Sequence, residues 1–343
     1  MSTKLNITGV DEKPKMGPGE FSLGDNNQMN NEGLWTKSQG GTERMYQRLI
    51  KELPKDLSDQ FQIICSRVRE LEANKKKVLW LHDLWNDPEN DHLKDDLLVK
   101  RFERLVFVSN WQMHSFNMGL GVKYDDSIVL KNAIDPIDEK LINKPDPKKE
   151  LRLIYHTTPH RGLELLVPVF EYLDKHHKNI HLDVFSSFEI YGWGHRDKQY
   201  EHVLDKCKSH PNITYHGFAD HSKVMEALGK AHIFAYPSIW VETSCIAVLE
   251  AMSAKCITVC PNLGALPETC ANFASMYQWT EDPNIHVNRF ASILDGTIKA
   301  IRNNLDWTKQ LTVQKNFFDN FYDWRFRSQE WKVLLEGLSQ NKK

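Results

Sequence analysis

Short apolar runs alternate with amphipathic stretches along most of the chain. The apolar runs predict ten β-strands, at residues 5–10, 61–65, 78–81, 105–108, 127–130, 151–155, 181–185, 213–215, 233–236 and 257–259. The stretches between them carry apolar residues at helical spacing, and they predict helices that include 42–52, 111–118, 164–176, 198–208 and 222–230. Alternation of strands and helices predicts an α/β fold with parallel sheets that helices cover on both faces.

Ten strands are many for one such sheet, and they split into two groups of about five. Residues 136–150, between the groups, are rich in proline and charge and predict an interdomain linker. We therefore expect an N-terminal domain at 1–140, a C-terminal domain at 151–312 and a final helical segment at 313–343. Two parallel sheets that face each other would form a cleft at the carboxyl ends of their strands. Residues 16–31, rich in Gly, Pro and Asn, predict a long loop.

Composition excludes several classes of protein. The chain has 343 residues, 41% of them hydrophobic, which is enough for two domain cores. Its formal net charge of -2 gives no reason to expect a nucleic-acid partner. No apolar run approaches the length of a membrane span and the N-terminus lacks the core of a signal peptide, so we expect at most peripheral membrane contact. The six cysteines form no CxxC pair, which indicates reduced core residues of a cytoplasmic protein.

The clearest candidate chemistry follows the apolar run at 231–236. Glu242 and Glu250 bracket Thr243, Ser244 and Cys245 and an apolar helical stretch. We expect Glu242 in the loop at the helix start and Glu250 about two turns further in. An eight-residue step rotates about 800°, so both carboxylates can lean toward one side. The three intervening N–H groups would lie at a helix N-terminus, where anions bind. This set suits a ligand with both hydroxyl and phosphate groups.

Two segments in the first half place small or polar residues at element ends. Gly40 and Gly41 open the predicted helix 42–52, where glycine lets the backbone approach a ligand. The first predicted strand lies about thirty residues upstream, so either the intervening loop is long or that strand is misplaced. His82 and Asp83 follow strand 78–81, at the carboxyl end where α/β proteins keep their chemistry. A simple glycine turn and a structural histidine are the alternative interpretations.

Candidate cations for a phosphate group lie in the second half. Arg161, which precedes Gly162, comes soon after strand 151–155, and arginine can bind phosphate oxygens through two N–H groups. Thr157 and Thr158 offer hydroxyl donors just upstream, and Arg196 is a candidate for a second cation. The source of that second cation stays open at this point.

Taken in order, these segments resemble the retaining glycosyltransferases of the GT-B fold, family 4. Gly40-Gly41, His82-Asp83, Arg161-Gly162 and the Glu-x7-Glu pair each match a motif of that family. Further matches lie at 108–112, 131–135, 192–194, 215–218 and 262–268. The resemblance implies two Rossmann-like parallel-sheet domains that face a cleft, with a C-terminal helix crossing back to the N-terminal domain. The aromatic stretch 317–335 fits that helix, and packing within its own domain is the alternative.

The resemblance also implies roles for residues. Glu242 would contact hydroxyls of the donor sugar beside the amides of Thr243, Ser244 and Cys245, and Glu250 would bind the ribose. The implied catalytic residues are His82, Arg161 and Glu242. The other donor-binding residues it implies are Gly40, Gly41, Thr157, Thr158, Gly192 and Gly217, with Arg161 at the diphosphate.

The implied activity is hexosyl transfer with retention of configuration. The sugar would pass from a nucleotide-diphosphate sugar to a glycan, lipid-linked or other hydroxyl acceptor. Arg161 and helix dipoles would stabilise the leaving diphosphate, and no Asp-x-Asp motif stands in a loop suited to a metal, so we expect no metal or other cofactor. Alternatives are a non-catalytic protein that binds sugar nucleotides or glycans, a GT-B nucleotide-sugar epimerase, and a DNA-modifying glucosyltransferase, which the near-neutral charge disfavours. The sequence leaves the base, the sugar and the acceptor open.

Overall fold

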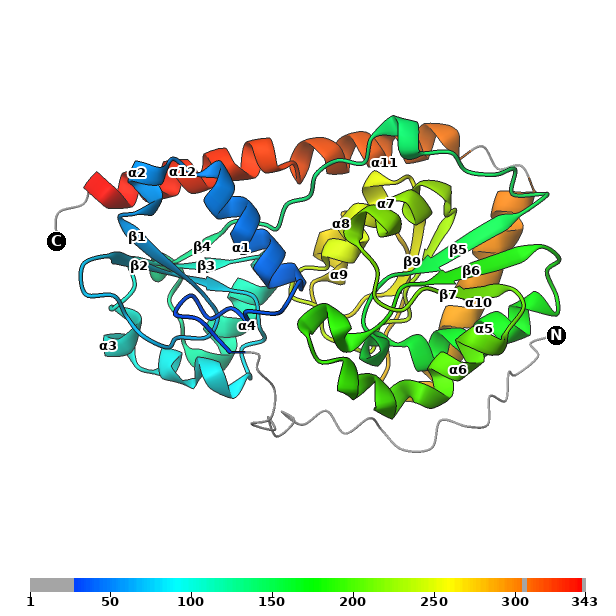
Figure 1. Cartoon of the computed structure of the whole chain (residues 1–343), viewed down its shortest axis with the longest axis horizontal. Coiled ribbons are helices and arrows are strands. Elements are labelled where there is room, and N and C mark those ends of the chain that lie inside the picture. Colours follow the sequence, from blue (N-terminus) through cyan, green and yellow to red (C-terminus); the bar gives the residue numbers. More distant parts are fainter. Residues whose placement is uncertain (1–27, 304–306, 341–343) are drawn as a thin grey trace.

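The computed structural model describes residues 28–303 and 307–340, and within them two parallel sheets lie in successive halves of the chain (Figure 1). The first sheet has the strand order β1-β2-β3-β4 and the second has the order β10-β9-β8-β5-β6-β7. The strands are β1 (Phe61–Cys65), β2 (Lys76–Leu81), β3 (Arg104–Phe107), β4 (Ser127–Val129), β5 (Leu151–Tyr155), β6 (Ile180–Val184), β7 (Ile213–Tyr215), β8 (Ile233–Ala235), β9 (Ile257–Pro261) and β10 (Ser275–Tyr277).

Helices cover the sheets and connect the strands (Figure 1). They are α1 (Gly41–Glu52), α2 (Lys55–Ser58), α3 (Asp96–Val99), α4 (Asn110–Leu120), α5 (Leu163–Asp174), α6 (Glu201–Ser209), α7 (His221–Lys230), α8 (Ile246–Ser253), α9 (Leu266–Cys270), α10 (Pro283–Arg302), α11 (Thr308–Phe321) and α12 (Trp324–Gln340). Short 3-10 turns are η1 (Pro88–Lys94), η2 (Tyr124–Asp126), η3 (Glu139–Leu141), η4 (Pro159–Arg161), η5 (Phe188–Tyr191) and η6 (Gly194–Tyr200).

The predicted elements agree with this architecture at most positions. Nine predicted strands coincide with β1 to β9 to within two residues at either end, and the predicted strand 5–10 lies outside the described residues. The short strand β10 was not predicted, because three half-apolar residues give no pattern of their own. The prediction of one helix at 198–208 is wrong: η6 occupies the first part and α6 begins only at Glu201.

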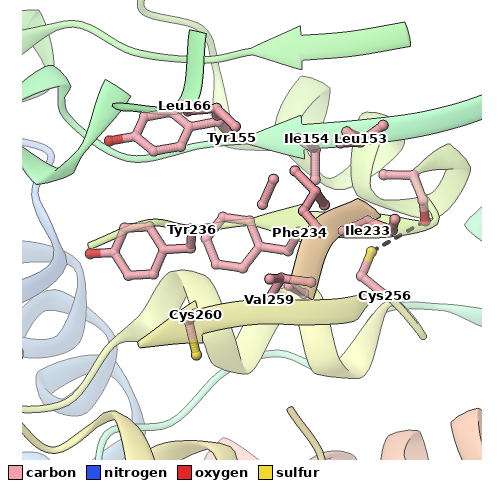
Figure 2. Close-up of a cluster of buried hydrophobic side chains, with 14 of the residues drawn as sticks. Leu153, Ile154, Tyr155, Leu166, Ile233, Phe234, Tyr236, Cys256, Val259 and Cys260 are labelled. Atoms are coloured by element: carbon pink, nitrogen blue, oxygen red, sulfur yellow. Dashed lines mark hydrogen bonds between the residues drawn. The ribbon is translucent and has the colours of Figure 1, made fainter. Parts of the chain in front are cut away.

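The core of the second sheet explains why its strands read as continuous apolar runs. Figure 2 shows Leu153 from β5, Phe234 from β8 and Val259 from β9 packed as a fully buried layer. A parallel strand with helices on both faces has no solvent side, so polar residues do not alternate along it. Tyr155 and Tyr236 close this layer at the carboxyl ends of β5 and β8, and their hydroxyls point to the same side. That side faces the N-terminal domain, and so the tyrosines mark where the sheet meets the junction.

The last two helices join the domains. In Figure 1, α11 lies along the C-terminal domain and α12 continues along the N-terminal one. Phe318 and Tyr322 are buried in the C-terminal core, whereas Trp331 and Leu335 are buried in the N-terminal core. This confirms that the aromatic segment crosses back.

The expectation of one continuous helix through 317–335 is wrong, because α11 ends at Phe321 and α12 begins at Trp324. The backbone N–H of Ile134 donates to the Tyr322 carbonyl over 2.8 Å, and Asp323 accepts from the N–H of Arg325 over 2.7 Å. The break therefore lies where the segment passes the start of the interdomain linker. The side chain of Asp323 serves as a cap for the new helix.

All six cysteines are buried and free, as their apolar surroundings predicted.

Candidate functional site

The two glutamates of the Glu-x7-Glu pair lie in different kinds of backbone. Glu242 is in the loop that follows β8 and Glu250 is inside α8, and each residue is 5% exposed. Helix α8 begins only at Ile246, with Cys245 as its N-cap, so Glu250 lies just over one turn into it. The expectation of two turns is therefore wrong, and so is the rotation argument built on it, because residues 242–244 are not helical. The loop, rather than a shared helix face, positions Glu242.

Glu242 is neutralised by groups of its own domain. Its Oε1 accepts hydrogen bonds from Arg161 Nη1 and from the hydroxyl of Tyr236. The Arg161 guanidinium also lies 5.6 Å from the ring centre of Trp240, and its Nε lies 3.3 Å from Thr158 Oγ1. Burial opposes the charge on Arg161, but Glu242 outweighs it and the pKa of Arg161 is raised. A buried cation thus lies directly against a buried carboxylate.

Glu250 is neutralised partly from the other domain. Its Oε1 accepts from His221 Nε2 over 2.7 Å and from Arg44 Nη2 over 3.3 Å, and His156 Nδ1 lies 4.0 Å from Oε2. Arg44 stands in the first turn of α1, which belongs to the N-terminal domain. Burial would raise the pKa of Glu250, but His221, Arg44 and His156 lower it to about 2. Glu250 is therefore a carboxylate ion at any pH above that value, ready to accept hydrogen bonds.

His82 lies at the carboxyl end of β2 and is held by neighbours of its own domain. Its ring centre is 4.6 Å from that of Trp80, and its backbone N–H donates to Ser66 Oγ over 2.8 Å. Burial, with the charge of Arg67, lowers the pKa of His82 to about 3. The imidazole is therefore neutral near pH 7 and can offer a hydrogen bond but no charge. Asp83, the adjacent acid, pairs with Arg67 at 3.0 Å.

The Gly40-Gly41 pair lies against the C-terminal domain. A Cβ on Gly40 would stand 2.6 Å from Tyr191 Cε1, and one on Gly41 would stand 3.0 Å from Ile246 Cδ1. A larger residue at Gly40 would require the Tyr191 ring to move, and one at Gly41 would crowd the Ile246 side chain. The missing side chains of the two glycines thus allow the first turn of α1 to approach the start of α8.

The remaining predicted donor residues gather in loops at the carboxyl ends of β5, β6 and β7. Thr157 and Thr158 follow β5, and Thr158 is buried beside Arg161. Gly192 ends η5 with φ of 72°, and Gly217 follows β7 with φ of 63°. The candidate second cation, Arg196, lies over the ring of Trp193 at 5.0 Å, and within the described part of the chain it forms an ion pair with neither glutamate.

The loop before α8 binds the N-terminal domain directly. The hydroxyl of Thr243 donates to the carbonyl of His82 over 2.7 Å, and the Ser244 carbonyl accepts from Asn132 Nδ2 over 3.3 Å. The first bond joins the residue next to Glu242 to the strand end that carries His82. The predicted site residues of both halves are thus brought to one junction.

A second contact across the junction involves Glu268 of the matched segment 262–268. Its carboxylate accepts from the backbone N–H groups of Asn110 and Trp111 over 3.0 and 2.9 Å, and it pairs with Lys131. Burial opposes the charge of Glu268, but Lys131 and the two N–H groups lower its pKa. The N-terminus of α4 suits an anion, and so Glu268 fastens the C-terminal domain to it.

Sequence reasoning missed four groups around the glutamates: Arg44, Tyr236, His156 and His221. Arg44 stands three residues after Gly41, so its place beside the glycine pair was a usable signal. Tyr236 ends a predicted strand, and its position was a usable signal because α/β proteins bind ligands at the carboxyl ends of their strands. His221 gives no such signal, because only the fold brings α7 next to α8.

A pocket of ≈ 270 Å³ opens beside Glu250 between the two domains. Its lining includes Arg44, Arg48 and Lys51 of α1, with Trp324 at the start of α12. The pocket thus joins one glutamate to a basic face of the opposite domain.

Metal-binding and membrane-spanning features are absent from the described ranges, 28–303 and 307–340. These ranges hold no group of three or more His, Cys, Asp and Glu side chains arranged to bind a metal ion. None of their helices combines the length and hydrophobicity that a membrane crossing needs.

Comparison with known proteins finds a family match to part of the chain. Residues 136–300 match the model of Glycosyl transferases group 1. Over 221 residues the chain is 28% identical to a phosphatidylinositol N-acetylglucosaminyltransferase subunit of Homo sapiens, a match that covers 62% of this chain and 41% of that protein. The Arabidopsis thaliana protein of the same name is 31% identical over 117 residues, or 34% of this chain and 24% of that protein. The chain thus spans less than half the length of the curated relatives it matches.

Solved structures share the fold. A glycosyltransferase from Rickettsia africae has a TM-score of 0.64 at 15% identity, over 82% of this chain and 77% of the other. The pneumococcal O-GlcNAc transferase GtfA, solved with UDP and GlcNAc, has a TM-score of 0.59 at 10% identity, over 78% and 53%. These similarities establish the GT-B arrangement of two parallel-sheet domains, as the sequence predicted.

Proposed function

We propose that this protein is a retaining glycosyltransferase, because residues 136–300 match the model of the glycosyl transferases group 1 family. It transfers a sugar from a nucleotide-diphosphate sugar to a hydroxyl of a glycan or lipid-linked acceptor. The observation that carries this proposal is the pair of buried carboxylates at the domain junction. Glu242 and Glu250 each have a cationic neighbour and lie beside the residues that the family resemblance assigned to the donor.

The proposed donor site divides between the two glutamates. A ribose presents two neighbouring hydroxyl donors, and Glu250, ionised above about pH 2, is the matching acceptor. Glu242 accepts from hydroxyls of the donor sugar, beside the Thr243, Ser244 and Cys245 amides. Arg161 lies between Thr158 and Glu242 and holds the diphosphate. An arginine carries five N–H donors, so its bonds to these two residues do not exhaust it.

We propose that transfer takes place on one face of the sugar. The bond from the anomeric carbon to the diphosphate oxygen breaks, and the acceptor oxygen bonds to the same carbon from the same side. The acceptor proton passes to the leaving diphosphate. Buried Glu242 supports this route, because Arg161 and Tyr236 already occupy its Oε1 and hold it as a positioning group. His82, neutral near pH 7, contributes a hydrogen bond to the sugar from the opposite domain.

Electrostatic stabilisation by Arg161 and by the helix termini at the junction makes metal unnecessary in this proposal. The names of similar proteins give a starting donor. The human relative is named as a phosphatidylinositol N-acetylglucosaminyltransferase, and GtfA was solved with UDP and GlcNAc. We therefore propose UDP-N-acetylglucosamine as the first donor to test, a lipid-linked acceptor as the first acceptor, and the cytoplasm as the place of action.

A calorimetric screen tests the donor site. Wild type and Glu250→Ala are titrated with UDP-, GDP-, ADP- and dTDP-sugars, with and without a divalent metal ion. We expect one nucleotide class to bind wild type without metal and to lose most of its affinity in the variant. Binding to none of them by folded wild-type protein would defeat the proposal.

Turnover separates a transferase from a binding protein. With the bound donor and a panel of lipid-linked and glycan acceptors, release of nucleoside diphosphate should depend on the acceptor. Tight binding without turnover on any acceptor would favour the non-catalytic alternative, whereas conversion of the donor sugar to its epimer would favour an epimerase.

A further inference from the structure

The proposed donor site is short of positive charge on its C-terminal side. The diphosphate of a sugar nucleotide carries more than one negative charge, and Arg161 already compensates Glu242. Charge-assisted contacts from several cations are the usual means of stabilising such a group. Arg196, the candidate from the sequence, lies over the rings of Trp193 and Phe188 instead.

Arg44 supplies a cation from the other side of the junction. Its side chain is 34% exposed and reaches from α1 to the C-terminal domain, where Nη2 lies 3.3 Å from Glu250 Oε1 and 2.8 Å from His221 Nε2. Both of these partners belong to the C-terminal domain, whereas Arg48, one turn further along α1, pairs with Glu52 at 3.1 Å and with Asp135 at 2.9 Å. The long contact of Arg44 to Glu250 is the weaker of the two that Oε1 receives.

Arrival of a ribose changes the contacts of Glu250. Two ribose hydroxyls would donate to its two carboxylate oxygens, each of which accepts about two hydrogen bonds. Oε1 already accepts two, from His221 and from Arg44, so a hydroxyl that binds Oε1 displaces one of them. The short bond that His221 Nε2 donates, at 2.7 Å, can remain, and the longer one from Arg44 is the one that gives way. Because that nitrogen donates its proton to Glu250, it cannot also accept from Arg44 Nη2, and their 2.8 Å approach does not hold the arginine. A released Arg44 then lies beside the bound ribose. The diphosphate is attached to that same ribose, so the free cation is near it.

On the basis of the proposed donor site, we propose that Arg44 is a donor-binding residue that leaves Glu250 for the diphosphate when the ribose binds. It would supply the second cation from the N-terminal domain. The phosphate site would therefore be complete only when the two domains are together. The opposing domains would then each give one arginine, Arg161 and Arg44.

The test separates phosphate binding from ribose binding. UDP is titrated calorimetrically into wild type, Arg44→Met, Arg44→Lys and Arg48→Met, and uridine is measured with the same proteins by ligand-observed NMR. We expect Arg44→Met to weaken UDP binding about tenfold or more, as loss of a charged hydrogen bond does. Its uridine affinity should stay the same or rise, because Glu250 loses a competing partner. Arg44→Lys should lie between, and Arg48→Met, the matched control on the same helix, should bind both as wild type does.

Two results would overturn the assignment. One is UDP binding by folded Arg44→Met at wild-type affinity. The other is an equal loss of UDP and uridine affinity, which would place Arg44 at the ribose or in the fold alone. Thermal unfolding of each variant identifies a protein that has failed to fold. If Arg44→Met does not fold, Arg44→Lys is compared with wild type instead. Failure of the proposed function looks different, because wild type would bind no nucleotide at all.

Discussion

Glu242 and Glu250 come from one short motif, yet their charges are balanced in different ways. The groups that bond Glu242, Arg161 and Tyr236, belong to the same domain as Glu242 itself. Glu250 receives one of its two closest partners, Arg44, from the opposite domain. Separation of the domains would leave the Glu242 cluster intact and would remove a cation from Glu250. The first half of the site is therefore preformed, and the second is completed by the junction.

The difference fits the tasks proposed for the two residues. A carboxylate that positions the reacting sugar gains from partners that do not move. A carboxylate that receives the nucleotide first gains from a partner that can be exchanged. The following experiments test whether the two glutamates differ in this way.

Removal of Arg161 should have the largest effect, because it acts on the preformed half. In Arg161→Met the buried Glu242 loses its cation and the diphosphate loses a stabilising donor. We expect kcat to fall about 10²–10³-fold, as it does when one electrostatic stabiliser is removed. Steady-state kinetics with saturating donor measure this.

Arg161→Lys is the matched variant for that experiment, because it keeps the charge but loses the planar fork of donors. It should recover part of the rate. Wild-type turnover in Arg161→Met would show that the preformed half does not hold the reacting groups.

A pH series tests the second half of the site, the one completed by the junction, because the charge of Glu250 depends on pH. Its pKa is 4.5 in the unfolded chain and about 2 in the folded protein, so its charge stabilises the fold fully above pH 4.5. This stabilisation, about 3 kcal/mol, is lost as the pH falls from 4.5 toward 2. The free energy of unfolding of wild type should therefore exceed that of Glu250→Gln near neutral pH, and the gap should close by about 3 kcal/mol at the acid end. Urea unfolding at several pH values measures the gap.

Buried histidines add a pH dependence of their own, since the pKa values of His82 and His156 are lowered and their protonation destabilises the fold below pH 6.5. The difference between wild type and Glu250→Gln removes most of that contribution. Glu226→Gln, at an exposed carboxylate of α7, is the control for the substitution itself. A constant gap for Glu250→Gln would mean that its charge is not balanced in the folded protein.

The sequence allowed the sheets and the motif residues to be predicted for a physical reason. Strands such as β5 and β8 are buried on both faces, and so their sequences are continuous apolar runs. The place of His82 or Arg161 at a strand end then follows, because the carboxyl ends of parallel strands meet at one edge of a sheet. Local pattern thus determined the elements and the edge on which the site lies.

The partners of those residues could not be predicted in the same way. Arg44 and His221 stand 206 and 29 residues from Glu250 along the chain, and no periodicity links such distances. The break between α11 and α12 also has a tertiary cause, since the Tyr322 carbonyl accepts from the N–H of Ile134, just before the linker. The start of α8 was misplaced because polar residues such as Thr243 and Ser244 often begin a helix, whereas here the N-cap is Cys245.

The smallest expected effect comes from the junction itself. Thr243→Val removes the 2.7 Å hydrogen bond to the His82 carbonyl while keeping the shape of the side chain, and Thr243→Ser keeps the hydroxyl as a control. We expect Thr243→Val to lower the free energy of unfolding by about 1 kcal/mol, the usual net contribution of one such bond. Because the junction brings Arg44 to Glu250, the acid-dependent stability gap should shrink in the Thr243→Val background. Turnover that depends on Arg161 should change little once donor is saturating. If the acid-dependent stability gap and the turnover at saturating donor both fell to the same extent, the two glutamates would depend equally on the junction. The distinction between them would then fail.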